Sequence, residues 1–224
     1  MLGASVTGVF FVPMSFIQHA LNTFFPPLCV HCHREGAWLC PIAIALLEEE
    51  RPLVNPIQIP GVDRVLTRGS YDCPSMSSIV QAIKYNYWTG STILLRPLLA
   101  PLRSYLSDMT SATIVPVPLH TRRLRERGFN QSMYIAKALS AELGQPVVNL
   151  LRRTTYTTPQ ATLTARERIT NIIGAINSGD NTSWPTSVIL VDDVITTGST
   201  IAECAKVLRH NGVQHICAVA IAKG

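Results

Sequence analysis

The stretch that most restricts the possible folds of this chain is Val188–Thr200, VILVDDVITTGST. Its mostly β-branched apolar run ends in two adjacent carboxylates and then in a turn of hydroxyl residues and glycine. After the turn, the pattern predicts a helix to about His210. A short apolar run that ends in polar residues is typical of a buried parallel strand. The sequence therefore predicts a strand–turn–helix unit of an α/β sheet.

The turn after this strand has the composition of a phosphate-binding cradle. A helix N-terminus presents unpaired backbone N–H groups and the positive end of the helix dipole. Glycine lets the backbone approach a phosphate closely, and hydroxyl groups add further donors. The candidate cradle residues are Thr196, Thr197, Gly198, Ser199 and Thr200.

Two acids, Asp192 and Asp193, stand directly before the cradle. Carboxylates would repel a phosphate, so they suit a neighbouring group that donates hydrogen bonds, such as ribose hydroxyls, or a divalent cation. Sugar plus phosphate is therefore the ligand that this stretch predicts. The alternatives are an acid pair of the kind found in response-regulator and ATPase sheets, and a turn that serves only as a helix cap.

Positive charge is concentrated in one part of the chain. Nine basic and three acidic residues lie between His120 and Arg168. The net charge of this block, +6, exceeds the +5 of the whole chain. Such a block predicts a polyanionic ligand, either pyrophosphate or nucleic acid, with a solvated basic face as the alternative.

The most basic stretch follows a second predicted buried strand, Ala112–Pro118. If this strand and the one before Asp192 are parallel, the loops after them meet at the same edge of the sheet. The candidate pyrophosphate ligands in this loop are Arg122, Arg125 and Arg127. Lys84, near the end of the predicted helix Pro74–Tyr87, could face the same anion site.

Three of the six cysteines lie within twelve residues and predict a zinc site. They are Cys29, Cys32 and Cys40, and the first two have the spacing of a zinc knuckle. A structural site needs four ligands, but the natural fourth position is occupied by Ala43, which cannot coordinate a metal. His33 or Cys73 could replace it. The alternative is a knuckle that has lost its metal and is held by packing.

A proline-rich linker at 51–61 predicts a boundary between an N-terminal segment, 1–50, and an α/β domain, 62–224. Residues 1–28 contain no Lys, Arg, Asp or Glu, so the basic region of a secretory signal is missing. Polar residues and a proline interrupt any membrane span there, and Ser15–Phe25 predicts an amphipathic helix packed on its own domain. We therefore expect a cytoplasmic protein, with membrane contact as the alternative.

Other elements follow from apolar periodicity. The expected strands are Val62–Tyr71, Pro146–Leu151 and His215–Ile221, and the expected helices are Asn130–Leu143 and Thr92–Asp108, which Pro97 and Pro101 interrupt.

Three motifs in order, VPVPLHTRRLRERGFNQS, TPQATLTARERITNIIGAI and VILVDDVITTGST, resemble the competence protein F (ComF) family of phosphoribosyltransferase-like proteins. The third closely matches the phosphoribosyl-pyrophosphate (PRPP) binding motif of type I phosphoribosyltransferases. The resemblance implies a type I phosphoribosyltransferase-like α/β fold. Its central, mainly parallel sheet would be flanked by helices, with a small zinc-knuckle-like segment at the N-terminus. Ala43, in place of a fourth cysteine, departs from the family pattern.

The resemblance also implies roles for residues. Asp192 and Asp193 would hold the ribose 2′- and 3′-hydroxyls and, with Arg127, form the catalytic set. The cradle would bind the 5-phosphate, and Arg122, Arg125 and Arg127 would meet the pyrophosphate. The implied cofactors are Mg²⁺, bound with PRPP, and Zn²⁺.

The biological setting that the resemblance implies is DNA uptake in natural competence, with single-stranded DNA and competence proteins as partners. Two alternatives remain: a catalytically silent module that binds single-stranded DNA through its basic loop, and a nucleobase-salvage phosphoribosyltransferase. The sequence shows no general base for an incoming acceptor, so PRPP binding and transferase activity are separate hypotheses.

Overall fold

The computed structural model describes residues 26, 28–85, 95–155, 174–179 and 183–224. Its centre is a five-stranded sheet with the order β1-β2-β7-β6-β3. The strands are β1 (Leu53–Val54), β2 (Arg64–Ser70), β3 (Thr113–Pro116), β6 (Ser187–Ile195) and β7 (His215–Lys223). All neighbouring pairs are parallel except β1 and β2 at the edge. The expected mainly parallel α/β sheet is confirmed.

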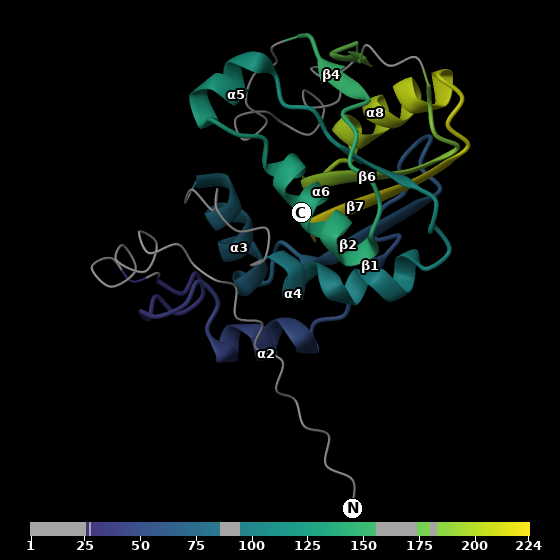
Figure 1. Cartoon of the computed structure of the whole chain (residues 1–224). Coiled ribbons are helices and arrows are strands. Elements are labelled where there is room, and N and C mark those ends of the chain that lie inside the picture. The colour runs from purple at the N-terminus through teal and green to yellow at the C-terminus, as the bar shows by residue number, and fades with distance from the viewer. Residues whose placement is uncertain (1–25, 27, 86–94, 156–173, 180–182) are drawn as a thin grey trace, which may run out of the picture.

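Helices cover both faces of this sheet (Figure 1). The helices of the described residues are α2 (Pro41–Glu49), α3 (Pro74–Tyr85), α4 (Arg96–Leu99), the 3-10 helix η2 (Ala100–Leu106), α5 (Thr121–Arg127), α6 (Gln131–Leu143) and α8 (Ser199–His210). Of these, α5 buries no residue and does not cover the sheet. Successive side chains of a strand point to opposite faces. In β6, Ile189 and Val191 pack with α3 and α6, whereas Val188 and Leu190 pack with α8. The buried strand predicted before Asp192 is therefore enclosed on both sides.

A second, two-stranded sheet lies against α8. Strand β4 (Leu151–Arg153) pairs antiparallel with β5 (Ile176–Ser178). Leu151 and Ile176 share a hydrophobic cluster with Cys204 and Leu208 of α8. In Figure 1 this small sheet stands beside α8, above the central sheet.

Two expected elements differ in the structure. Instead of a strand at Pro146–Leu151, Val147 forms an isolated bridge to Ile114, and β4 begins at Leu151. The expected helix at Thr92–Asp108 is divided into α4 and η2, each with a proline in its first turn. A proline has no N–H to donate and clashes with the preceding turn, so a continuous helix cannot pass through both prolines. The predicted helix Ser15–Phe25 lies outside the described residues.

The arginine-rich segment that was predicted as a loop contains the helix α5. The ring nitrogen Nδ1 of His120 accepts a hydrogen bond from the Arg122 N–H and caps the start of this helix. Gly128 ends it in the left-handed region, with φ at +80°. Because α5 is a helix, its arginines point in different directions rather than sharing one loop surface.

The N-terminal segment packs into the main core. Ala43 and Leu47 of α2 belong to the same hydrophobic cluster as Met76 and Ile79 of α3. The domain boundary at 51–61 stays a prediction. Within the residues that the structure describes, no helix combines the length and apolarity needed to cross a membrane.

Candidate functional site

A cavity of about 650 Å³ opens at the carboxyl ends of the parallel strands. Tyr71 follows β2, Gly224 follows β7 and Val117 follows β3, and all three line the cavity with the end of β6. This is the edge at which open α/β sheets bind ligands, and the volume lies in the range of small-molecule sites. The structure thus brings the acid pair and the predicted cradle into one cavity.

All five predicted cradle residues line this cavity: Thr196, Thr197, Gly198, Ser199 and Thr200. Gly198 is the N-cap of α8, with φ at +76°, a conformation that favours glycine. A Cβ at this position would lie 2.8 Å from the Cδ1 and Cγ1 atoms of Ile59. The turn thus packs closely against Ile59 and lies at the start of α8, where helix N–H groups can bind an anion.

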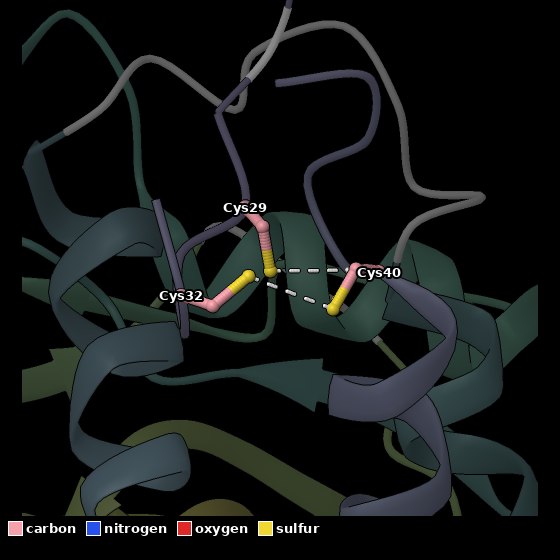
Figure 2. A group of neighbouring side chains, drawn as sticks. All are labelled: Cys29, Cys32 and Cys40. Carbon is pink, nitrogen blue, oxygen red and sulfur yellow. Dashed lines mark hydrogen bonds between the residues drawn. The ribbon is translucent and has the colours of Figure 1, made fainter. Parts of the chain in front are cut away.

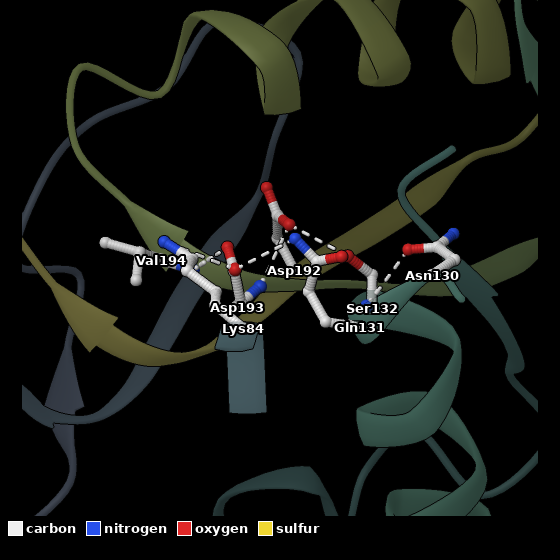
Figure 3. Close-up of polar contacts among 7 residues, drawn as sticks. All are labelled: Lys84, Asn130, Gln131, Ser132, Asp192, Asp193 and Val194. Carbon is white, nitrogen blue, oxygen red and sulfur yellow. Dashed lines mark hydrogen bonds and ion pairs between the residues drawn. The ribbon is translucent and has the colours of Figure 1, made fainter. Parts of the chain in front are cut away.

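The two acids are held by side chains from two other elements (Figure 3). Ser132 donates its hydroxyl to Oδ1 of Asp192 at 2.9 Å. Gln131 donates from Nε2 to Oδ2 of Asp193 at 3.2 Å, and the ammonium group of Lys84 lies 3.4 Å from the same oxygen. Residues from α3, α6 and β6 therefore converge on the pair.

The surroundings of Asp192 disfavour its charged form. Burial and the neighbouring carboxylate of Asp193 raise the pKa of Asp192 to about 7, while the Ser132 hydroxyl and the Lys84 charge oppose this rise. Near neutral pH the carboxyl group of Asp192 is therefore only partly ionised, and a nearby cation or hydroxyl donor would favour its ionised form.

The end of the motif VPVPLHTRRLRERGFNQS supplies two of the partners of the acid pair, Gln131 and Ser132. Asn130 caps α6 by accepting a hydrogen bond from the Ser132 N–H at 3.1 Å, and its Nδ2 donates to the Val117 carbonyl at 3.0 Å. This cap places Gln131 and Ser132, both buried, in the first turn of α6 beside β6. Sequence reasoning missed both residues, although a capping Asn followed by two polar residues was a usable signal.

The basic residues are divided between the cavity and the surface. Of the three arginines predicted for pyrophosphate, Arg127 lines the cavity, whereas Arg122 and Arg125 are not among its lining residues. Nε of Arg122 donates to Oε1 of Glu126 at 3.0 Å. Two arginines that sequence reasoning did not single out, Arg123 and Arg153, line the cavity, as does Lys84.

Figure 2 shows the sulfur atoms of Cys29, Cys32 and Cys40 pointing toward one another. All three lie within 4.8 Å of one another, and the Cys32 and Cys40 sulfurs are 3.8 Å apart. Tetrahedral zinc with Zn–S bonds of about 2.3 Å separates its sulfurs by about 3.8 Å. The arrangement fits a metal held by three thiolates. Neither His33 nor Cys73 belongs to this group.

The backbone favours the thiolate of Cys29, whereas the pKa of the Cys32 thiol is raised, because a backbone hydrogen bond from Arg34 is outweighed by burial and by the neighbouring Cys29 and Cys40 side chains. Burial opposes ionisation of Cys29, but hydrogen bonds from the backbone of Cys40, Cys32 and His31 outweigh it and lower the pKa of the thiol to about 7. The Ala43 N–H donates to the sulfur of Cys40 at 3.4 Å. Because thiolates rather than thiols bind metals, the lowered pKa of Cys29 suits it to be a metal ligand.

Comparison with known proteins identifies the family. Competence protein F of Haemophilus influenzae is 32% identical to this chain over 207 residues, which are 89% of this chain and 85% of that protein. The chain belongs to the competence protein F family. DNA utilization protein YhgH of Escherichia coli K12 is 32% identical over 193 residues, 83% of this chain and 84% of that protein. The family resemblance carried by the three motifs is thus confirmed.

Two further comparisons are weaker. No protein-family model matches the chain. Among solved structures, an adenine phosphoribosyltransferase aligns with a TM-score of 0.35 at 14% identity, covering 80% of this chain and 89% of that one. A match this loose carries no argument about the site of this competence protein F family member.

Proposed function

We propose that this protein binds PRPP, or a closely related phosphosugar, in the cavity at the carboxyl ends of the strands. One observation carries the proposal: the cradle and the acid pair line the same cavity. The cradle can donate hydrogen bonds to a phosphate, and the acid pair directly beside it can accept hydrogen bonds from hydroxyls. Together they are complementary to a sugar phosphate.

We further propose that the chemistry is phosphoribosyl transfer, in which the bond from ribose C1 to pyrophosphate breaks and a bond to an acceptor forms. Positive charge grows on the sugar and negative charge on the leaving group. Asp192 and Asp193 would orient the ribose through its hydroxyls, and Arg127 would stabilise the departing pyrophosphate. Removing one such preorganised contact costs about 10²–10³-fold in rate in other enzymes. The same role for Arg122 and Arg125 stays a prediction.

Mg²⁺ suits this donor set, because it prefers oxygen ligands and binds through one or two carboxylates together with substrate phosphates. Asp192 and Asp193 are the residues that would hold it. When bound, it would neutralise charge on the pyrophosphate.

The names of the relatives support a setting in the handling of DNA. They are called competence protein F and DNA utilization protein. We propose DNA uptake in natural competence as the process that this protein serves, with single-stranded DNA and competence proteins as candidate partners.

The test of the proposed ligand is calorimetric titration of PRPP with Mg²⁺ into the wild type and into Asp192→Asn/Asp193→Asn. We expect the wild type to bind and the double variant to lose affinity by about 100-fold or more, because two charge-assisted contacts are removed. The matched control is Glu48→Gln/Glu49→Gln, which removes two exposed carboxylates from α2 and should bind like the wild type. Absence of binding by a folded wild type would refute the proposal.

We also propose that Cys29, Cys32 and Cys40 bind one Zn²⁺ ion, on the strength of their converging sulfurs. Elemental analysis of the purified wild type should find about one zinc per chain, and Cys32→Ser should lose it. The variants His33→Ala and Cys73→Ser separate the two candidate fourth ligands. A wild type with well under one equivalent would mean that packing, not metal, holds the knuckle.

A further inference from the structure

Asp192 and Asp193 are neighbours in β6, and successive side chains of a strand point to opposite faces of the sheet. Leu190 packs with α8, whereas Val191 packs with α3 and α6. The same alternation directs Asp192 to the side of α8, where the cradle lies, and Asp193 to the side of α3 and α6. Burial, and then the charge of Asp192, raise the pKa of the Cys204 thiol in α8, which agrees with this orientation. The two acids therefore have different surroundings.

Asp192 has a carboxylate oxygen that is available to a ligand. Its Oδ1 accepts hydrogen bonds from the Ser132 hydroxyl and from the Asp193 N–H, both at 2.9 Å. Among the residues that the structure describes, none donates a hydrogen bond to its Oδ2. Figure 3 shows this oxygen pointing away from the other labelled residues. Because Asp192 lines the cavity, its Oδ2 can accept a hydrogen bond from a ligand hydroxyl.

Both oxygens of Asp193 are engaged within the protein. Oδ1 accepts a hydrogen bond from the Val194 N–H at 2.7 Å. Oδ2 accepts a hydrogen bond from Nε2 of Gln131 at 3.2 Å and lies 3.4 Å from the ammonium group of Lys84. Asp193 is also only 6% exposed. Its carboxylate therefore contacts side chains of α3 and α6 and offers neither oxygen to a ligand hydroxyl.

Lys84 has hydrogen-bond donors that Asp193 does not use. An ammonium group carries three N–H donors, and within the described part of the chain Asp193 is its one partner. The Lys84 side chain lines the cavity from α3, on the opposite side of β6 from α8 and the cradle. PRPP carries its 5-phosphate and its pyrophosphate at opposite ends of the ribose. A sugar anchored in the cradle would therefore extend its pyrophosphate away from α8, to the side on which Lys84 lies.

We propose that the two acids have different roles: Asp192 contacts the sugar through its Oδ2, whereas Asp193 is a positioning residue that holds the Lys84 ammonium against the pyrophosphate. The proposal rests on the proposed function, and it divides the role that was given there to the acid pair as a whole. A lysine side chain is flexible, and holding it in place before the ligand arrives reduces the entropy that is lost on binding.

The test measures by calorimetry the affinities of ribose 5-phosphate and of PRPP for the full chain, both with Mg²⁺. We expect Asp192→Asn to weaken both ligands about tenfold or more, because both carry the ribose hydroxyls. It should bind inorganic phosphate like the wild type, since the cradle is unchanged. Asp193→Asn and Lys84→Met should each weaken PRPP about tenfold or more and leave ribose 5-phosphate, which has no pyrophosphate, near its wild-type affinity.

This difference between the two ligands separates positioning from a folding defect, which would weaken both ligands alike. The matched control for Lys84→Met is Lys206→Met, because Lys206 is an exposed lysine of α8 that does not line the cavity. It should bind both ligands like the wild type.

Double variants show whether Asp193 acts through Lys84. Asp193→Asn/Lys84→Met should bind PRPP no more weakly than Lys84→Met alone, whereas Asp192→Asn/Lys84→Met should lose more affinity than either single variant. Equal losses of ribose 5-phosphate in Asp192→Asn and Asp193→Asn would overturn the inference and leave the proposed function standing. Additive losses of PRPP in Asp193→Asn/Lys84→Met would do the same. A folded wild type that binds neither ligand would refute the proposed function and the inference with it.

Discussion

Replacing Gly198 with alanine is expected to lower the free energy of unfolding by about 3 kcal/mol and to remove the proposed binding of PRPP. The left-handed backbone at φ +76° costs a non-glycine residue about 1–2 kcal/mol. In addition, the new Cβ would lie 2.8 Å from two atoms of the buried Ile59 side chain, and overpacking of this kind costs about 1–3 kcal/mol. Relief of the clash would displace the cradle. Urea unfolding and calorimetry measure the two effects.

A matched control separates backbone strain from the clash. Gly144 has nearly the same backbone, with φ at +74°, but a Cβ there would meet nothing within 4 Å. Gly144→Ala should therefore cost only the strain and leave PRPP binding intact. In an Ile59→Ala background, Gly198→Ala should cost less than in the wild type. Equal losses for the two glycine variants, with binding retained in both, would show that contact with Ile59 does not shape the cradle.

The parts of the site that lie together in sequence could be predicted from it. Asp192, Asp193 and the cradle belong to one strand–turn–helix unit, so a single motif fixes their relative positions. Ser132 and Lys84 reach the acid pair from α6 and α3, across sequence separations of 60 or more residues. The sequence indicated that Lys84 could face the anion site, and it lines the cavity. The partner atoms that Lys84 and Ser132 contact depend on how the helices pack against the sheet, which no local pattern specifies.

In the arginine-rich segment, the sequence located the basic region more reliably than the individual arginines that line the cavity. In an α-helix, residues four apart lie on the same face. Arg123 and Arg127 are spaced in this way and both line the cavity, while Arg122 pairs with Glu126. The sequence interpretation treated the segment as a loop, in which this spacing has no meaning. Recognition of the Gly128 C-cap would have indicated the helix.

The strands were predicted better than the helix boundaries. The buried strands β3, β6 and β7 are apolar runs whose side chains pack on both faces of the sheet, so composition alone marks them. The helix α2 was not expected, because its short sequence, PIAIALLEE, has no strong helical periodicity. Its main support comes from contacts with the rest of the protein, and Arg68 provides one that can be tested.

Replacing Arg68 with leucine is expected to destabilise the protein by about 2–4 kcal/mol, because it removes buried, charge-assisted hydrogen bonds. Arg68 lies in β2 and is only 1% exposed. Its guanidinium donates to the Glu50 carbonyl at 2.7 Å and also to the Leu47 carbonyl, both at the C-terminal end of α2. The last carbonyl groups of a helix have no hydrogen-bond partner within the helix, and the last turn of α2 contains no basic residue. The Arg68 guanidinium therefore caps the C-terminal end of α2.

Urea unfolding, combined with hydrogen exchange of the α2 amides, measures this contribution. The control is Arg64→Leu in the same strand, which breaks the pair with the exposed Asp108 and should cost less than about 1 kcal/mol. If both variants lower the free energy of unfolding equally, the contacts of Arg68 with α2 add no more stability than the exposed pair of Arg64 with Asp108.

The number of steps in which Arg68→Leu unfolds in urea also tests the predicted boundary at 51–61. Ala43 and Leu47 share the core of α3, so we expect Arg68→Leu to unfold in a single transition at lower urea. An early, separate loss of α2 protection would instead support an N-terminal unit that folds independently of the sheet. In the first case, zinc binding at the cysteines would stabilise the whole protein and with it the ligand cavity. In the second case it would stabilise only the segment that contains the cysteines.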